Sequence, residues 1–596
     1  MASDLCLTGL LSALVFSLAH YGAFLNPFVI NDDVRQQVAW IYQWRDPTLF
    51  VGDYLTEFAR HYVAWGVRGL YWAVVRFIDP VLFSKFLTGG LFIWLGLVLF
   101  LLGNCLGGRK LGHAAVVVLW CTPFFLHEMS GGLSRSFAPP LLAQFAWAMV
   151  TRRPWTAIIT LFLQALCIPY IFVLSATTVV LSWFGWRFRF LGSPTIGGRW
   201  WHYLILIGGA ALVWAFGHEL EVAGYGPMVG SADIIGHEEF SKAGRLLIFP
   251  VPSLLSEFIS PWEYILSFRD GGILSGMLVS IGLLWIVFAI RRRISWYKLG
   301  RTTLPLLPLA AASILLYFLA CRVLLKLFVP SRYVEYSINL SYLLLLGCIL
   351  QTALVSLSDR RTIALVLLFA TALFGGLRLH GAGLYDFSAD RLLYERVAQL
   401  PKGALLAGHP YLMDNVFTFS HRRALITFEL AQPWCKGLWK NLKPRIEDLL
   451  HAYYADDATT VRLFCRKYDI DFFIIDLRHF HPDFFCEKKS YALICDVLPG
   501  PNFFKRACRS LGLTQSIELP PYWERLYPAC PPFFAPFDRL VRDLTLTRTN
   551  FVLLNNDIFP AEHIGLFQRL IDVRSLRNRS IFTNTITTEL IPTLKK

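Results

Sequence analysis

Long apolar runs fill the first part of the chain and leave few folds open to it. Residues 1–378 consist of apolar stretches with charged residues between them, whereas residues 379–596 carry frequent Asp, Glu, Lys and Arg. Over the whole chain 55% of residues are hydrophobic and 16% are charged, against about 25% charged in soluble proteins. A helix that crosses a bilayer needs about 20 mostly apolar residues. The pattern predicts a polytopic α-helical membrane domain over 1–378 and a soluble domain over 379–596.

Eleven apolar segments are predicted to cross the membrane, and every second connection between them is short and basic. Basic loops stay in the cytoplasm. The N-terminus is therefore predicted to lie in the cytoplasm, and residues 379–596 outside the cytoplasmic (inner) membrane. The predicted spans are 5–29, 81–104, 112–126, 136–151, 155–169, 170–185, 201–217, 271–290, 304–326, 336–357 and 362–378. The basic connections contain Arg109, Lys110, Arg152, Arg153, Arg187, Arg189, Arg199, Arg291, Arg292, Arg293, Lys298, Arg301, Arg360 and Arg361.

One uncharged stretch decides the number of spans. Trp155–Trp186 is long for one helix and short for two, and both of its flanks are basic. Two short helices that turn near Pro169 keep both flanks in the cytoplasm. A single helix would place the soluble domain on the other side of the membrane.

The net charge of +15 is explained by basic residues in the loops of a membrane protein. Many basic residues fall in the short loops, and no nucleic-acid-binding motif is visible, so we expect no nucleic-acid partner. No Walker A loop, GxSxG motif or Rossmann glycine fingerprint is present. The beginning, MASDLC, has no basic residue before the apolar run, which predicts a retained first helix and not a cleaved signal.

Long outer loops are predicted over 30–80 and 218–270, and short ones over 127–135 and 327–335. The first outer loop, 30–80, holds the most informative residues, Asp32 and Asp33, directly after the first predicted span. Adjacent carboxylates at a membrane surface are costly unless they are solvated, paired or functional. They are a candidate general base and candidate ligands of a divalent cation. Alternatively, they cap the amphipathic helix predicted over 55–80, which carries Trp65, Tyr71 and Trp72.

The acidic pair, the long outer loop, the many spans and the external C-terminal domain resemble the GT-C superfamily of integral membrane glycosyltransferases. The resemblance is distant and without a close family match. It implies a sugar donor on a polyprenyl phosphate or diphosphate, inverting transfer to a hydroxyl of a glycan, lipid or protein, and an essential acid in the first outer loop. That acid is Asp32 or Asp33, with Asp32 favoured as the base. A divalent cation, Mg or Mn, is a possible cofactor, with Asp32 and Asp33 as its possible ligands.

Further substrate-binding candidates lie on the same predicted side of the membrane. The glycines of HEMSGGLSRSF allow close backbone approach, and Arg135 is suited to a carrier phosphate or to lipid headgroups. Arg332 resembles the cation that GT-C enzymes place near the donor phosphate, unless it pairs with Glu335. The candidates are Arg35, His127, Glu128, Arg135, Arg332, Tyr333 and Glu335.

The C-terminal residues predict an α/β domain. A turn and a strand are expected over 400–406, and a helix over 459–467 precedes a buried strand over 468–476. These segments are similar to external domains of GT-C proteins related to oligosaccharyltransferase. A WWDYG-like motif is missing, so N-linked oligosaccharide transfer is not expected. Six cysteines beyond residue 379 allow up to three disulfides.

Two other functions stay open. A transporter or flippase of a lipid-linked saccharide usually shows inverted repeats and charges at mid-membrane, and neither is visible here. A non-catalytic partner in surface polysaccharide assembly also fits a large external domain. The enzyme hypothesis is preferred because the charged candidates gather at the outer ends of the predicted spans.

Overall fold

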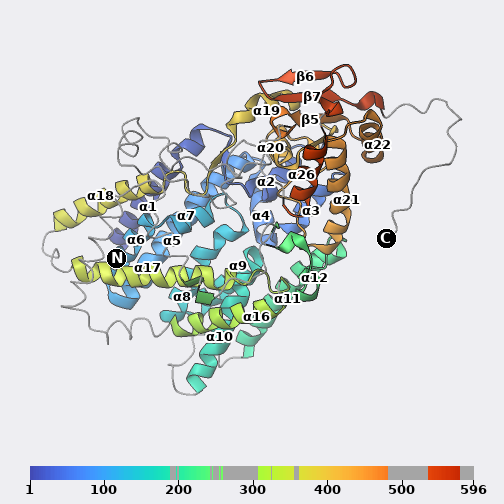
Figure 1. The fold of residues 1–596 in the computed structure, drawn as a ribbon. Helices are drawn as coiled ribbons and strands as arrows, with labels where there is room; N and C mark the ends of the chain where they lie inside the picture. Colours follow the sequence, from blue (N-terminus) through green and yellow to red (C-terminus); the bar gives the residue numbers. More distant parts are fainter. Residues whose placement is uncertain are drawn as a thin grey trace.

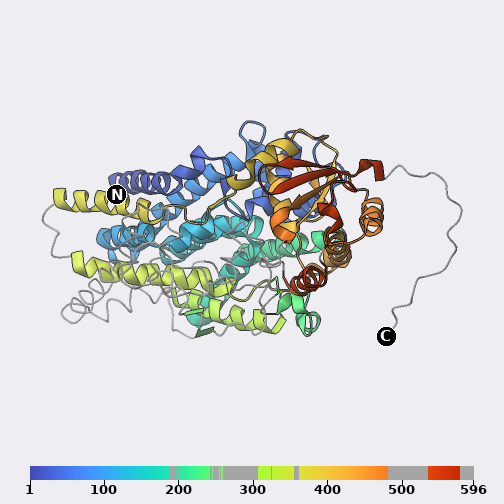
Figure 2. The ribbon, with the colours of Figure 1, turned by 45° about the horizontal axis from the view of Figure 1, so that its top comes forward.

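The computed structural model describes residues 1–187, 196, 200–241, 244–245, 254–255, 257–258, 306–323, 325–354, 361–480, 534–548 and 550–576. Long helices form a bundle, and a small sheet with its own helices lies at one end of it (Figure 1). The N-terminus lies at the opposite end of the bundle from the sheet, and Figure 2 shows the same arrangement after rotation.

Apolar helices occupy the predicted spans. Each predicted segment coincides with a helix, except 271–290, which lies outside the described residues. The bundle contains α1 (Ala2–Leu25), α5 (Pro80–Gly107), α6 (Arg109–Cys121), α7 (Pro123–Met129), α8 (Ala138–Val150), α9 (Pro154–Cys167), α10 (Pro169–Arg187), α11 (Trp200–Val222), α16 (Leu307–Val323), α17 (Arg332–Leu354) and α18 (Arg361–Arg378).

The helices differ in whether they are long and apolar enough to cross a membrane. Among the described residues, α1, α5, α11 and α17 are long and apolar enough, and the bent pair α6–α7 is a fifth candidate. Helices α9, α10, α16 and part of α18 are apolar but shorter. The chain is therefore an integral membrane protein, and the total of eleven spans stays a prediction.

Prolines break the apolar runs where the chain turns. Helix α9 ends at Cys167, Ile168 takes φ −152° and ψ 78°, and α10 begins at Pro169. The residue before a proline is pushed out of the helical region, and proline fits the first helical position. The predicted pair of short helices is confirmed. Pro123 similarly separates α6 from α7, and the two helices meet at 68°.

Different polar contacts are present at the two ends of α1. At the N-terminal end of α1, Asp4 pairs with Arg109, and the Nε2 atom of His113 lies 3.4 Å from the Asp4 carboxylate. At the other end of α1, Lys85 donates to the carbonyl of Ala23 at 2.5 Å. Arg109, a residue predicted to be cytoplasmic, thus lies beside the N-terminus. The side of the membrane on which each end lies stays a prediction.

The first outer loop folds into short helices: α2 (Val34–Gln37), the 3₁₀-helix η1 (Ala39–Trp44), α3 (Tyr54–Tyr62) and α4 (Trp65–Val74). The single helix predicted over 55–80 is therefore wrong. Val63 and Ala64 adopt ψ angles of 132° and 142°, which break the helix. Trp72 is exposed as expected at an interface, whereas Tyr71 is buried and donates to the carbonyl of Gly132 at 3.1 Å.

A five-stranded mixed sheet forms the centre of the C-terminal region. Its order is β4-β3-β5-β7-β6, with β3 parallel to both β4 and β5 and the other pairs antiparallel. All residues of β5 are buried, so the predicted buried strand is confirmed. The strands are β3 (Leu405–Gly408), β4 (Arg423–Ala424), β5 (Phe472–Asp476), β6 (Ala561–Ile564) and β7 (Gln568–Asp572).

Helices pack beside this sheet in two groups. Helix α19 contacts α20, and α21 contacts both α22 and α26. Cys435, on the turn before α21, is buried with a free thiol. Cys486, Cys495, Cys508 and Cys530 lie outside the described residues, so the disulfides stay a prediction. These helices are α19 (Arg391–Val397), α20 (Pro410–Ser420), α21 (Lys436–Tyr453), α22 (Ala458–Tyr468) and α26 (Phe537–Thr547). Short elements elsewhere in the described part of the chain are η2 (Ser134–Phe137), α12 (Ser231–Ile234), η3 (Glu238–Phe240), η6 (Ser388–Asp390), η7 (Leu477–Phe480), η9 (Val552–Leu554) and η10 (Arg574–Leu576).

A two-stranded ladder joins the bundle to this region. Strand β1 (Val29–Ile30), just after α1, pairs antiparallel with β2 (Tyr385–Asp386), just after α18. The first outer loop therefore starts at the point where the chain enters the C-terminal region. The division into domains at residue 378 stays a prediction, because these contacts cross it.

Glycines test the packing of the bundle. A Cβ on Gly112 would lie 2.7 Å from the Phe100 carbonyl oxygen of the neighbouring α5, whereas a Cβ on Gly90 would meet nothing within 4 Å. We expect Gly112→Ala to destabilise the protein by roughly 1–3 kcal/mol, the usual cost of overpacking. Gly90→Ala should instead stabilise it by up to about 1 kcal/mol, because alanine favours a helix more than glycine does. Thermal unfolding in detergent, followed by tryptophan fluorescence, measures both, and equal melting temperatures would contradict the α5–α6 contact.

Candidate functional site

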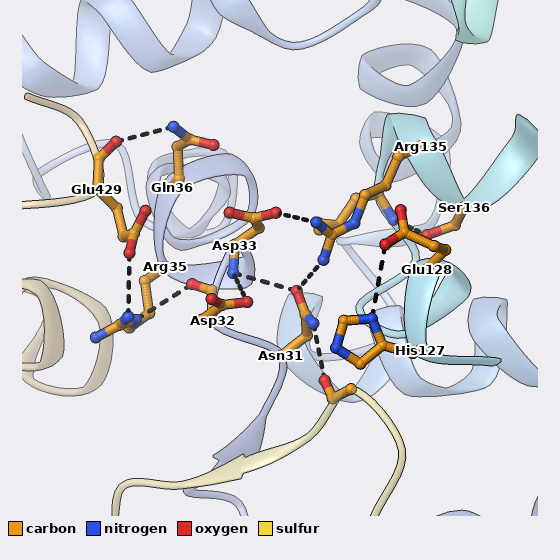
Figure 3. A network of polar contacts seen from close by, with 12 residues as sticks. Asn31, Asp32, Asp33, Arg35, Gln36, His127, Glu128, Arg135, Ser136 and Glu429 are labelled. Carbon is orange, nitrogen blue, oxygen red and sulfur yellow. Dashed lines mark hydrogen bonds and ion pairs between the residues drawn. The ribbon is translucent and has the colours of Figure 1, made fainter. Parts of the chain in front are cut away.

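A tight turn after β1 sets the direction of the acidic pair (Figure 3). The side chain of Asn31 is buried, and its Oδ1 accepts the backbone N–H of Asp33 at 3.1 Å. The same N–H lies 3.0 Å from Oδ1 of Asp32. Asparagine side chains that bind the backbone two residues on replace a backbone turn. The two carboxylates therefore leave the chain from a backbone that is already held.

An ion pair joins this turn to the second outer loop. Nη1 of Arg135 lies 2.6 Å from Oδ2 of Asp33, and its Nη2 donates to Oδ1 of Asn31 at 3.0 Å. Gly131, at φ 98°, brings the loop so close that a Cβ there would lie 3.0 Å from that of Asn31. The close approach predicted for these glycines is thus present, and Asp33 and Arg135, which are 102 positions apart in the sequence, meet.

The helix-cap alternative for the acidic pair does not describe this structure. Asp33 precedes α2, but its side chain accepts no bond from that helix. The longer helices have other caps. Asp53 accepts from the N–H of Thr56 at 2.8 Å at the start of α3, and Asp79 accepts from two N–H groups at the start of α5.

Burial changes the acidity of both partners of the ion pair. Desolvation raises the pKa of Asp33 to about 6, although the positive charge of Arg135 works in the opposite direction. Burial by itself would lower the pKa of Arg135, but the charges of Asp33 and Glu128 outweigh it and raise that pKa. Arg135 is therefore a permanent cation at this position, whereas Asp33 changes its charge near pH 6.

A second charged cluster lies at the start of α17. Nη1 of Arg332 lies 2.9 Å from Glu128, 2.8 Å from Glu335 and 3.2 Å from the hydroxyl of Tyr336. Nδ1 of His127 lies 3.6 Å from the other Glu128 oxygen. The pairing of Arg332 with Glu335, left open as an alternative, is present. It uses one nitrogen only, and Nε and Nη2 of Arg332 have no partner among the described residues.

Helical geometry selects the tyrosine of this cluster. Residues four apart lie on one face of a helix, so Tyr336 shares the face of Arg332 and donates to Glu128 at 3.0 Å. Tyr333 lies on another face and donates to the carbonyl of Leu327 at 2.5 Å. The structure therefore brings Tyr336 to the cluster in place of the predicted Tyr333. In the sequence, the spacing of four residues between Arg332 and Tyr336 could have indicated that Tyr336 joins the cluster.

Arg35 turns toward the C-terminal region and away from Asp33. Its Nη1 donates to Asn415 at 2.9 Å, its Nη2 lies 3.4 Å from Glu429, and Asp414 lies 3.9 Å away. The side chain is 2% exposed. Arg35 thus holds the first outer loop against α20, and a substrate-binding role for it stays a prediction.

Glu429 receives a second arginine that the sequence did not single out. Nη2 of Arg245 lies 2.7 Å from Oε2 of Glu429, and its guanidinium lies 3.9 Å from the centre of the Phe428 ring. Arg245 belongs to the predicted outer loop 218–270, of which the structure describes only parts. The carboxylate of Glu429 therefore joins both long outer loops to the C-terminal region.

Metal binding needs more donors than the acidic pair supplies. Within the described ranges, no group of three or more His, Cys, Asp and Glu side chains is placed to hold a metal ion. One oxygen of Asp33 is already engaged by Arg135. The possible divalent cation at Asp32 and Asp33 therefore stays a prediction of the sequence.

Among the solved structures that match this chain are oligosaccharyltransferases. The Archaeoglobus fulgidus oligosaccharyltransferase in complex with Zn and sulfate has a TM-score of 0.45 and 13% identity, over 84% of this chain and 70% of that one. The Archaeoglobus fulgidus protein AglB, in complex with an inhibitory peptide and a dolichol-phosphate, has a TM-score of 0.45 and 14% identity, over 81% and 70%. The apo form of the oligosaccharyltransferase has a TM-score of 0.42 and 13% identity, over 82% and 72%.

No protein-family model and no curated protein matches this chain. The three similar structures belong to the group of proteins with which the external domain was compared above.

The buried Arg35 cluster makes a testable difference to stability. Removing one partner of a buried ion pair leaves an uncompensated charge, which typically costs about 3–5 kcal/mol. We expect Arg35→Met to lower the melting temperature strongly and to expose the C-terminal region to proteolysis. Arg391→Met is the matched control, because Arg391 makes an exposed ion pair with Glu395, worth about 0.3–0.5 kcal/mol. If the two variants melted together, Arg35 would not hold the loop.

Proposed function

We propose that this protein is a glycosyltransferase of the GT-C type that transfers a sugar from a polyprenyl-phosphate or diphosphate carrier to an acceptor hydroxyl. The acidic pair, with Asp33 held by Arg135 and the Asp32 carboxylate without an ion-pair partner among the described residues, is the observation that carries the proposal. The site lies at the end of the bundle that bears the sheet, which is the predicted outer face of the membrane.

Asp32 is proposed as the general base. Its Oδ1 accepts the N–H of Asp33, and its carboxylate has no ion-pair partner among the described residues. A hydroxyl is a poor nucleophile near neutral pH, and a carboxylate within hydrogen-bond reach removes its proton as the new bond forms. Asp33 is engaged by Arg135 and serves to orient that arginine. The two carboxylates are therefore not equivalent.

The arginines are proposed to hold the carrier phosphate. The leaving group gains negative charge as the bond to the sugar breaks, and fixed cations stabilise that charge. Arg332 presents Nε and Nη2, the edge that binds a phosphate in a bidentate manner. Its Nη1 is held by Glu128 and Glu335, which fixes the plane of the guanidinium. Direct attack of the acceptor on the side opposite the phosphate inverts the anomeric centre.

The proposed substrates follow from this charge distribution. A lipid-linked donor reaches the site from the bilayer, and the acceptor, a glycan, lipid or protein hydroxyl, from the outer face. In this proposal the base is a carboxylate and the phosphate partners are arginines. A requirement for Mg or Mn stays a prediction of the sequence.

Transfer by substituted enzymes tests the proposal. The purified full chain would be reconstituted in vesicles with a panel of radiolabelled polyprenyl-phosphate and polyprenyl-diphosphate sugars, and transfer of label out of the lipid donor would be measured. We expect Asp32→Asn to reduce transfer by about 10²–10⁴-fold, the usual contribution of a general base, and Asp33→Asn to cause a smaller loss. Asp46→Asn is the control, because Asp46 lies in the same loop and pairs with Lys402.

Near-native transfer by both Asp32→Asn and Asp33→Asn would contradict the catalytic role of the pair. Equal losses in Asp46→Asn would show a general effect on the loop and not on the reaction. Because asparagine keeps the shape of aspartate and Asp32 makes no ion pair with a described residue, the melting temperature of Asp32→Asn should stay near that of the wild-type protein, whereas Asp33→Asn removes the partner of Arg135 and should melt lower.

The acidity of Asp33 predicts a pH profile. The raised pKa, about 6, means that Asp33 is ionised above this pH and becomes protonated as the pH falls through it. The proton removes the partner of Arg135, so we expect transfer to decline below about pH 6. Removing the arginine charge, which lowers this pKa, should raise the pKa. In Arg135→Gln the residual transfer should therefore decline at a higher pH than in the wild-type protein. A profile that stays in place in that variant would contradict the assignment to Asp33.

A further inference from the structure

A small cavity lies in the first outer loop, apart from the residues around Asp33. It has a volume of about 300 Å³ and is bounded by the end of η1 and by helices α3 and α4. The residues that matter to its chemistry are Gln43, Trp44, Arg60, Trp72 and Arg76. None of them takes part in the proposed transfer.

The charges that face this cavity are mainly positive. Arg60 donates to Gln43 at 2.5 Å and lies 3.4 Å from Glu57, but its buried Nε has no hydrogen-bond partner. Arg76 is exposed and makes no ion pair with any described residue, and its guanidinium lies 5.7 Å from the centre of the Trp72 ring. Two guanidinium groups with unused donors, beside two indole rings, suit an anion that carries apolar groups.

The position of the cavity relative to the membrane follows from the chain. Arg76 precedes by four residues the start of α5, a helix long and apolar enough to cross the membrane. The loop around Trp44 is tied to the same point, because Tyr42 donates to Asp79 at 2.7 Å and Arg45 lies 3.6 Å from Asp79. Since the predicted span 81–104 begins at the start of α5, the cavity is expected at the level of the lipid headgroups.

The aromatic side chains beside the cavity fit the same level. Trp72, which lines the cavity, is 56% exposed, and Phe77, the residue after the lining residue Arg76, is 83% exposed. Aromatic residues are enriched at the interface between lipid and water, and arginine side chains there extend toward headgroup phosphates. A soluble anion would gain nothing from these exposed rings, whereas a lipid places its acyl chains against them.

We propose that this cavity binds the phosphate headgroup of an anionic membrane lipid, with Arg60 and Arg76 as phosphate ligands and Trp72 and Phe77 against the acyl chains. The site is separate from the proposed transfer site, so a lipid bound here is a resident partner of the outer loop. The charge-assisted bonds of each arginine make a distinct contribution to binding.

Native mass spectrometry of the purified full chain in detergent tests this site. The probes are phosphatidic acid and a diacylglycerol with the same acyl chains, which differ only in the phosphate. We expect the wild-type protein to retain phosphatidic acid in preference to diacylglycerol, and Arg76→Gln and Arg60→Gln each to weaken retention about tenfold, since hydrogen bonds to charged groups contribute on that scale. Arg391→Gln, on helix α19, which does not line the cavity, should retain the lipid as the wild-type protein does.

The variants and a competitor distinguish the alternatives. Trp72→Ala should weaken retention of phosphatidic acid if the rings contact the acyl chains, and excess inorganic phosphate should not displace the lipid. Displacement by inorganic phosphate would overturn the lipid assignment in favour of a free anion. Equal retention of diacylglycerol, or unchanged retention in Arg76→Gln, would overturn the phosphate site. Because the Arg76 side chain is exposed and makes no ion pair with a described residue, loss of binding in Arg76→Gln does not reflect loss of fold.

Discussion

The carboxamide of Asn31 joins the parts of the chain that form the proposed transfer site. Its oxygen accepts from the N–H of Asp33 and from Arg135, and its nitrogen donates to the carbonyl of Gly383 at 2.8 Å. Each of these bonds reaches a different segment: the acidic turn, the second outer loop, and the connection into the C-terminal region. A buried amide must satisfy its donors and acceptors within the protein, so these segments are held together at one residue.

The charged side chains around the proposed site form ion pairs of opposite sign. Asp33 contacts Arg135, Glu128 and Glu335 contact Arg332, and Glu429 contacts Arg35 and Arg245. Charges removed from water are tolerated when they are paired and hydrogen-bonded. Among the described residues, the pairing leaves Nε and Nη2 of Arg332 without a partner and the carboxylate of Asp32 without an ion pair. The proposed chemistry uses the atoms that the pairing leaves available.

Sequence reasoning succeeded where one local property decided the outcome. Hydropathy placed the apolar helices, and Pro169 placed the break between α9 and α10, because a proline restricts the residue before it. The run from Phe472 to Asp476 was recognised as a buried strand by its continuous apolar character. The single interfacial helix over 55–80 failed, because apolar periodicity does not show that the backbone extends at Val63 and Ala64. The site was predicted by residue type, and its pairings were found only in the structure.

The sequence by itself determined the membrane-embedded helices, the acidic pair at the end of the first of them and the presence of arginines in the outer loops, because each is a property of neighbouring residues. Only the tertiary structure decided which arginine meets which carboxylate. Arg35 is two residues from Asp33 in sequence but bonds to Asn415, 380 positions away, whereas Arg135 takes the position beside Asp33. The physical reason is that a side chain leaves its turn in one direction, set by the backbone, and its partner is the charge that packing places there. Contacts between distant segments depend on the whole fold, and no local pattern records them.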